Sequence, residues 1–125
     1  QDSIDGVVVH GAHRGRTIGF PTANLQTDNE LLPPNGVYAT TLTVDGVIHA
    51  SVTNIGVRPT VDQSGTVSVE THVFDVDLDL YDRTVRLGFV QRLRDERAFE
   101  SLDALKTQIA ADRDRARVLF ERLSL

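Results

Sequence analysis

Two stretches of β-branched residues, separated by a single Asp-Gly pair, constrain the fold of this chain more than any other feature. Residues 37–44 and 47–55 are rich in valine, threonine and isoleucine, which are typical of strands. Asp45-Gly46 between them is a link that tolerates the positive φ angles of a two-residue hairpin turn. The sequence therefore predicts an antiparallel hairpin over residues 37–55.

Other stretches with a similar composition predict further strands. They cover residues 4–11, 66–74 and 84–90, and residues 75–81 alternate acidic with apolar side chains, as a strand with one acidic face would. Residues 25–32 are mixed and carry only weak signals. About six short strands joined by hairpins predict an antiparallel barrel or sandwich.

The last part of the chain changes its period from that of a strand to that of a helix. Ser101 is a candidate N-cap, and Asp103 would lie in the first turn, where the helix dipole favours an acid. We expect a C-terminal helix of roughly five turns that packs its apolar stripe on the sheet. The residues of this stripe are Leu102, Leu105, Ile109, Ala116, Leu119 and Leu123.

Composition limits the class of protein. The 125 residues are enough for one domain, residues 1–125, and the chain has no cysteine for disulfides or thiolate chemistry. The net charge of −5 argues against a nucleic-acid partner, because phosphate backbones favour basic surfaces. We also expect no membrane partner and a cytoplasmic location, since no apolar run or signal peptide is evident. The chain begins at Gln1 rather than Met, so we expect a domain of a longer protein.

The glycine-rich stretch over residues 14–24 is the first candidate for a ligand site. Its two arginines and its glycines suit an anion, above all a phosphate, because the backbone can approach closely beside positive charge. Thr22 and Asn24 add neutral oxygens that can face a phosphate-bound Mg²⁺. The stretch is not a P-loop, because no Gly-Lys-Ser/Thr opens a helix. An ordinary surface hairpin loop remains the alternative.

A second candidate lies in the strand over residues 66–74. Alternation places Val67, Val69, Thr71 and Val73 on the core face, and Ser68, Glu70 and His72 on the other. Glu70 is therefore a carboxylate on a rigid element that points away from the core, as a general base requires. A solvated sheet residue is the alternative.

Two charged stretches do not by themselves indicate one kind of site. Asp75, Asp77 and Asp79 resemble the start of a calcium loop, but Leu80 and Arg86 stand where glycine and glutamate are required. The cluster over residues 92–97 is either a solvated charge run or a clamp for a polar ligand before the helix.

Taken together, the motifs of this chain resemble the bacterial riboflavin kinases. The resemblance covers nearly the whole chain in the order of that family, and the Pro-Thr-Ala-Asn block followed by the Glu-Thr-His strand is specific to it. The stretches that carry it are Gly19–Asn24, Gly36–Tyr38, Asn54–Gly56, Val69–His72, Leu93-Arg94 and Phe99–Leu102.

The resemblance implies a fold and an activity. The fold is a six-stranded antiparallel Greek-key barrel, mainly β, with the C-terminal helix packed on it. The activity is transfer of the γ-phosphate of ATP to the 5′-hydroxyl of riboflavin, giving FMN and ADP with Mg²⁺ as cofactor. In bacteria this module typically follows an N-terminal FMN adenylyltransferase domain, so such a domain is the expected partner in the full-length chain.

The resemblance also implies roles for individual residues. Glu70 would be the catalytic base. Arg94, Arg97 and Phe99 would meet the flavin and its ribityl chain. Thr22 and Asn24 would hold the metal and, with others, the nucleotide; the implied ATP-binding residues are Gly11, Arg16, Thr22, Asn24, Val73, Asp75 and Tyr81.

Two further hypotheses bear on the activity. A non-catalytic flavin or nucleotide sensor on the same barrel would keep the pockets without needing Glu70 or the metal pair. The segment His10-Gly11-Ala12-His13 has two histidines at the spacing of an adenylyltransferase signature, but its glycine stands second, and Pro21 leaves no room for the helix that must follow. We therefore expect the chain to make FMN but not FAD.

Overall fold

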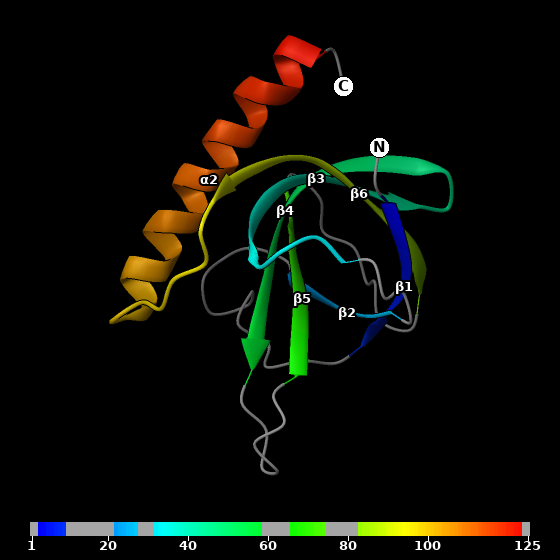
Figure 1. Ribbon diagram of the computed structural model, residues 1–125. Helices are drawn as coiled ribbons and strands as arrows, with labels where there is room; N and C mark the ends of the chain where they lie inside the picture. Colours follow the sequence, from blue (N-terminus) through cyan, green and yellow to red (C-terminus); the bar gives the residue numbers. More distant parts are fainter. Residues whose placement is uncertain (1–2, 10–21, 28–31, 59–65, 75–82, 124–125) are drawn as a thin grey trace.

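The computed structural model of the protein describes residues 3–9, 22–27, 32–58, 66–74 and 83–123. The described residues form one closed antiparallel barrel of six strands with a single long helix outside it (Figure 1). The order of strands around the barrel is β1-β2-β5-β4-β3-β6. The strands are β1 (Ser3–Val9), β2 (Thr22–Gln26), β3 (Gly36–Val44), β4 (Val47–Arg58), β5 (Thr66–Val73) and β6 (Thr84–Arg94).

This order is a Greek key, as the family resemblance implied. Strands β3, β4 and β5 are consecutive neighbours, and β2 lies on the far side of β5. Strands β1 and β6 pair with each other and close the barrel. Asp45 and Gly46 have φ angles of 52° and 80°, so the predicted hairpin turn with two positive φ angles is confirmed.

The strand prediction was wrong at several boundaries. Thr22–Gln26 is a strand, although we expected a loop through Asn24 and only weak structure after it. Strand β6 runs on to Arg94, beyond its expected end at residue 90, and β4 reaches Arg58, beyond its expected end at residue 55. Residues 10 and 11, as well as the expected strand over residues 75–81, lie outside the described part of the chain.

Inside the barrel, an apolar core surrounds a row of hydroxyl groups. The apolar part includes Ile4, Val8, Leu25, Leu42, Ile55, Val69, Val73 and Leu87. Thr40 Oγ1 lies 2.7 Å from Ser51 Oγ and 2.9 Å from Thr53 Oγ1, which in turn lies 2.9 Å from Thr71 Oγ1. All four hydroxyl side chains are fully buried. Each therefore depends on its neighbours for hydrogen bonds that water cannot supply.

The helix α2 (Leu102–Leu123) packs across the outer surface of β3 and β4 (Figure 1). Ser101 Oγ accepts a hydrogen bond from the backbone N–H of Ala104 at 3.1 Å, so the predicted N-cap is confirmed. The predicted stripe was wrong at its ends, because Leu102 and Leu123 are each 50% exposed. The buried stripe consists of Ile109, Asp112, Ala116 and Phe120.

A second apolar cluster fills the space between α2 and the barrel. It joins Ala116 and Phe120 of the helix to the outward-facing side chains of Val37, Ala39, Val52 and Leu93. The barrel is thus apolar on both faces where α2 covers β3 and β4, so this part of the outer surface is closed to ligands. Within the described residues, no helix has the length and apolar character needed to cross a membrane.

Candidate active site

Three side chains form a row across adjacent strands on the outer surface of the barrel. Asn24 on β2 is paired directly with Glu70 on β5, and Glu70 is paired directly with Asn54 on β4. Directly opposed residues of antiparallel strands bring their Cβ atoms to about 4.5–5.5 Å. The fold therefore places the one carboxylate of the row between two carboxamides that come from distant parts of the sequence.

Glu70 combines a position away from the core with burial. Its neighbours Val69 and Thr71 point into the barrel, so Glu70 points outward, as strand alternation predicted. The interpretation as a solvated sheet residue was wrong, because Glu70 is only 7% exposed. Val67, expected in the core, is 50% exposed. A buried carboxylate on a rigid strand is well placed for proton transfer to or from one ligand.

Thr22 lies beside this row and has a defined partner. Its Oγ1 is 3.0 Å from Nδ1 of His72, the residue with which it is paired across β2 and β5. His72 is buried, so the contact fixes the Thr22 hydroxyl on the outer face, two residues from Asn24. A hydroxyl and a carboxamide next to a carboxylate are oxygen donors of the kind that Mg²⁺ accepts together with phosphate oxygens and water. The predicted metal pair thus fits such an ion.

Arg94, at the end of β6, is tied to the helix. Its Nε and Nη2 donate to the carboxylate of Asp112 at 3.0 and 2.8 Å, and its Nη1 donates to the backbone oxygen of Asp95 at 3.0 Å. Asp112 is 1% exposed and also accepts a hydrogen bond from Gln108 at 3.0 Å. Three of the five N–H groups of Arg94 therefore dock α2 and hold the chain that leaves β6.

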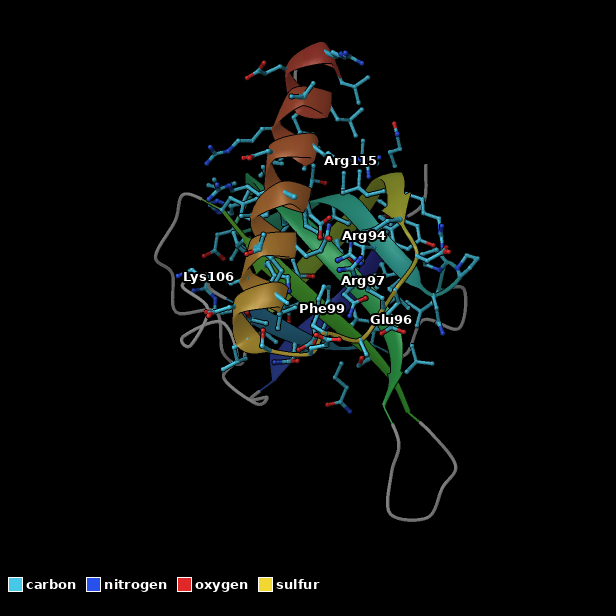
Figure 2. All side chains as sticks on the ribbon, turned by 90° about the vertical axis from the view of Figure 1, so that its left-hand side faces the viewer. Arg94, Glu96, Arg97, Phe99, Lys106 and Arg115 are labelled. Carbon is cyan, nitrogen blue, oxygen red and sulfur yellow. The ribbon has the colours of Figure 1, made fainter. Side chains whose placement is uncertain are left out.

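The segment 95–100, which we call the strap, joins β6 to α2 and carries the other predicted flavin residues. The guanidinium carbon of Arg97 lies 4.8 Å from the centre of the Phe99 ring, and that of Arg94 lies 5.8 Å from it. Figure 2 shows Arg94, Arg97 and Phe99 gathered where β6 ends and the chain turns towards α2. The structure thus brings the three residues together around one aromatic ring.

The strap also reaches the row on β4. The Glu96 carboxylate lies 3.5 Å from Nδ2 of Asn54, which is the long limit of a hydrogen bond. Gly56, on the same face as Asn54, makes this approach possible, because a Cβ atom there would lie 1.7 Å from Oε2 of Glu96. Asn54 was part of a quoted motif but received no role from the sequence. Its register opposite Glu70 is the signal that identifies it.

The remaining predicted site residues are placed as follows. The side chain of Val73 is fully buried inside the barrel, so only its backbone can reach a nucleotide outside. Gly11, Arg16, Asp75 and Tyr81 lie outside the described residues. Within the described part of the chain, no three acidic, histidine or cysteine side chains form a metal cluster.

Comparison with known proteins places these features in a family. Residues 2–120 match the Flavokinase family, described as riboflavin kinase. The chain belongs to the riboflavin kinase family. A relative from Pseudomonas fluorescens, a bifunctional riboflavin kinase/FMN adenylyltransferase, is 47% identical over 116 residues, which are 93% of this chain and 37% of that protein. The chain thus spans little more than a third of the length of this relative.

Solved structures agree with the fold. A riboflavin kinase from Trypanosoma brucei superposes with a TM-score of 0.68 at 26% identity, over 98% of this chain and 82% of that one. A protein from Streptococcus pneumoniae described as a macrolide-efflux protein gives a TM-score of 0.85 at 35% identity, over 92% of this chain and 38% of that one. The part of the Streptococcus pneumoniae chain that this chain covers, 38%, is close to the 37% that it covers of the bifunctional relative.

Proposed function

We propose that this chain transfers the γ-phosphate of ATP to the 5′-hydroxyl of riboflavin, giving FMN and ADP. The observation that carries the proposal is the row Asn24, Glu70 and Asn54, in which a single buried carboxylate lies between the predicted metal and nucleotide residue Asn24 and a carboxamide that contacts the strap. Phosphoryl transfer is mostly positioning and neutralisation of charge, with a carboxylate that orients the nucleophile. The row, together with Thr22, offers these parts on rigid strands.

In this proposal, Glu70 accepts the proton of the 5′-hydroxyl. The hydroxyl oxygen then forms a bond to the γ-phosphorus, and the bond from that phosphorus to the bridging oxygen of ADP breaks. Thr22 and Asn24 hold the phosphates and Mg²⁺, and His72 fixes the Thr22 hydroxyl through the contact described above. The ion supplies neutralisation of the phosphate charge.

On the flavin side, we assign the contacts with the ring to Phe99 and Arg97. The Phe99 ring can stack on a planar flavin ring, and the guanidinium beside it can donate hydrogen bonds to the oxygens of that ring. Arg94 is assigned a positioning role, because Asp112 and Asp95 accept hydrogen bonds from all three of its side-chain nitrogens and so fix the guanidinium in place. The expected roles of Gly11, Arg16, Asp75, Tyr81 and of the Val73 backbone at the nucleotide belong to the same proposal.

The proposal extends to the longer protein. By analogy with the bifunctional relative, an FMN adenylyltransferase domain would precede this one and use its product. The cytoplasmic location remains a prediction from the sequence.

The test is to incubate the purified chain with riboflavin, ATP and Mg²⁺ and to separate the flavins by chromatography. We expect FMN and ADP in equal amounts and, when FMN replaces riboflavin, no FAD. Binding of riboflavin and ATP without FMN formation would instead identify a sensor, and FAD formation would overturn the single-activity interpretation.

A further inference from the structure

Asn54 carries an unexplained polar atom. Its Oδ1 is buried and lacks a hydrogen-bond partner, the single case of this kind among the buried side-chain atoms of the described residues. The neighbouring Nδ2 faces the Glu96 carboxylate at 3.5 Å, and only the amino end of a carboxamide can donate there. This contact fixes which end of the carboxamide is Oδ1.

A buried acceptor without a donor destabilises a folded protein, and such groups are rare in native structures. A carboxamide oxygen can only accept a hydrogen bond, so what would satisfy it is an O–H or N–H group. The atom thus specifies the chemistry of its missing partner, which none of the described residues provides.

The position of Asn54 narrows the choice of this partner. On one side, its strand pairing places Glu70, the proposed base, directly opposite. On the other side, the Glu96 contact connects it to the strap that carries Arg97 and Phe99. If a substrate reaches from the Phe99 ring to Glu70, its middle part therefore lies against Asn54.

In riboflavin, the middle part is a ribityl chain with hydroxyl groups, each of which can donate a hydrogen bond. We propose that Asn54 Oδ1 accepts a hydrogen bond from a ribityl hydroxyl and so positions the terminal hydroxyl at Glu70. This inference rests on the proposed kinase activity and adds a specificity residue to it. Gly56 and Glu96 orient the carboxamide, because the glycine lets the Glu96 carboxylate lie on β4 next to Nδ2.

The experiment compares riboflavin with lumiflavin, which has the same ring but a methyl group in place of the ribityl chain. Affinities are measured from flavin fluorescence in the presence of Mg-ADP, for wild type and Asn54→Ala. We expect the variant to bind riboflavin roughly 3- to 10-fold more weakly, the range of one hydrogen bond, and lumiflavin as wild type does. Gln91→Ala, which removes an exposed amide side chain from β6, is the matched control and should change neither affinity.

A second variant covers the case in which Asn54→Ala does not fold. Gly56→Ala would displace only the flexible, exposed end of Glu96, so the barrel should tolerate it. Loss of the Glu96 contact should weaken riboflavin binding about 2- to 3-fold and leave lumiflavin binding unchanged.

The outcomes separate this inference from the proposed function. Equal weakening of both flavins, or no weakening of riboflavin, overturns the role of Asn54 while FMN formation by wild type keeps the kinase proposal. If wild type neither binds riboflavin nor forms FMN, the kinase proposal and this inference fall together.

Discussion

The buried carboxylate of Asp112 and the buried carboxamide of Asn54 show opposite ways of placing a polar group out of water. Both oxygens of Asp112 accept hydrogen bonds, from Arg94 and Gln108. Asn54 donates one long hydrogen bond, to the Glu96 carboxylate, and its Oδ1 acceptor has no partner among the described residues. The first group holds the helix on the barrel, whereas the second lies in the row with Glu70. In this molecule a buried group with all its hydrogen bonds made is structural, whereas the group with an unsatisfied acceptor is the one that we propose binds the substrate.

The largest effect on stability is expected at Asp112, the carboxylate whose two oxygens both accept hydrogen bonds. Asp112→Ala leaves the guanidinium of Arg94, whose side chain is 18% exposed, without its carboxylate. Breaking a buried ion pair costs about 3–5 kcal/mol, so the free energy of unfolding in denaturant should fall by about that amount. A loss below about 1 kcal/mol, the range of exposed pairs, would show that the pair does not hold the helix.

A double variant sharpens this prediction. Arg94→Met with Asp112→Leu replaces the pair by apolar side chains of similar size, which is often neutral or stabilising. We expect stability close to wild type and nearly unchanged riboflavin affinity. Restored stability together with a large loss of riboflavin affinity would show that Arg94 contacts the flavin directly.

A smaller effect is expected from the hydroxyl row inside the barrel. Thr53→Val keeps the volume but removes the group that links Thr40 to Thr71. Unsatisfied buried hydroxyls cost about 1–3 kcal/mol, so the denaturation midpoint should shift accordingly. Thr84→Val, at an exposed position of β6, is the control and should have no measurable effect. Equal stability of the two variants would mean that the hydroxyl row contributes nothing.

Substitutions in the predicted metal pair, Thr22 and Asn24, should change ligand affinity and not stability, the opposite of Asp112→Ala. Asn24→Ala should lower the affinity for Mg-ATP roughly 10-fold or more, because a hydrogen bond or ligand to a charged group is lost, while riboflavin affinity and stability change little. Calorimetric titration with Mg-ATP measures this. Unchanged affinity in both Asn24→Ala and Thr22→Ala would remove the metal role from both residues.

The smallest effect is expected at the exposed pair between Asp5 and Arg86. The hydrogen bond from Arg86 at 2.8 Å lowers the pKa of the Asp5 carboxyl below its usual 3.8. A carboxyl whose pKa is lower in the folded state stabilises the protein at any pH above its unfolded-state pKa. This stabilisation is lost as the pH falls through the folded-state pKa. Asp5→Asn should therefore lower the thermal midpoint slightly at neutral pH and match wild type once the pH falls below the lowered folded-state pKa of Asp5. A difference that grows in acid would contradict this assignment.

Sequence patterns predicted the parts of the fold that are determined locally. The Asp45-Gly46 turn and the Ser101 cap depend on neighbouring residues and were correctly placed. Strand β2 was missed because five residues acquire strand structure only by pairing with β1 and β5. No local pattern in Thr22–Gln26 could reveal those partners.

In the candidate site, too, local sequence predicted some features, whereas others depend on residues that are distant in the sequence. Alternation along β5 placed Glu70 on the outer face, but its burial depends on surroundings that alternation does not describe. The partner of Arg94 lies 18 residues away, at Asp112, which occupies a helical position one turn from Ile109 and Ala116. Spacing alone could have identified Asp112 as part of the buried stripe. Asn54 required the register between β4 and β5.

The central claim is that the row on β2, β5 and β4 is a site of proton transfer and not a structural network. Glu70→Gln tests it most directly, because glutamine keeps the shape of the side chain but cannot accept the proton. We expect a turnover lower by roughly 10²–10⁴, with riboflavin affinity, Mg-ATP affinity and unfolding free energy close to wild type. Turnover near that of wild type in a folded, substrate-binding variant would contradict the account.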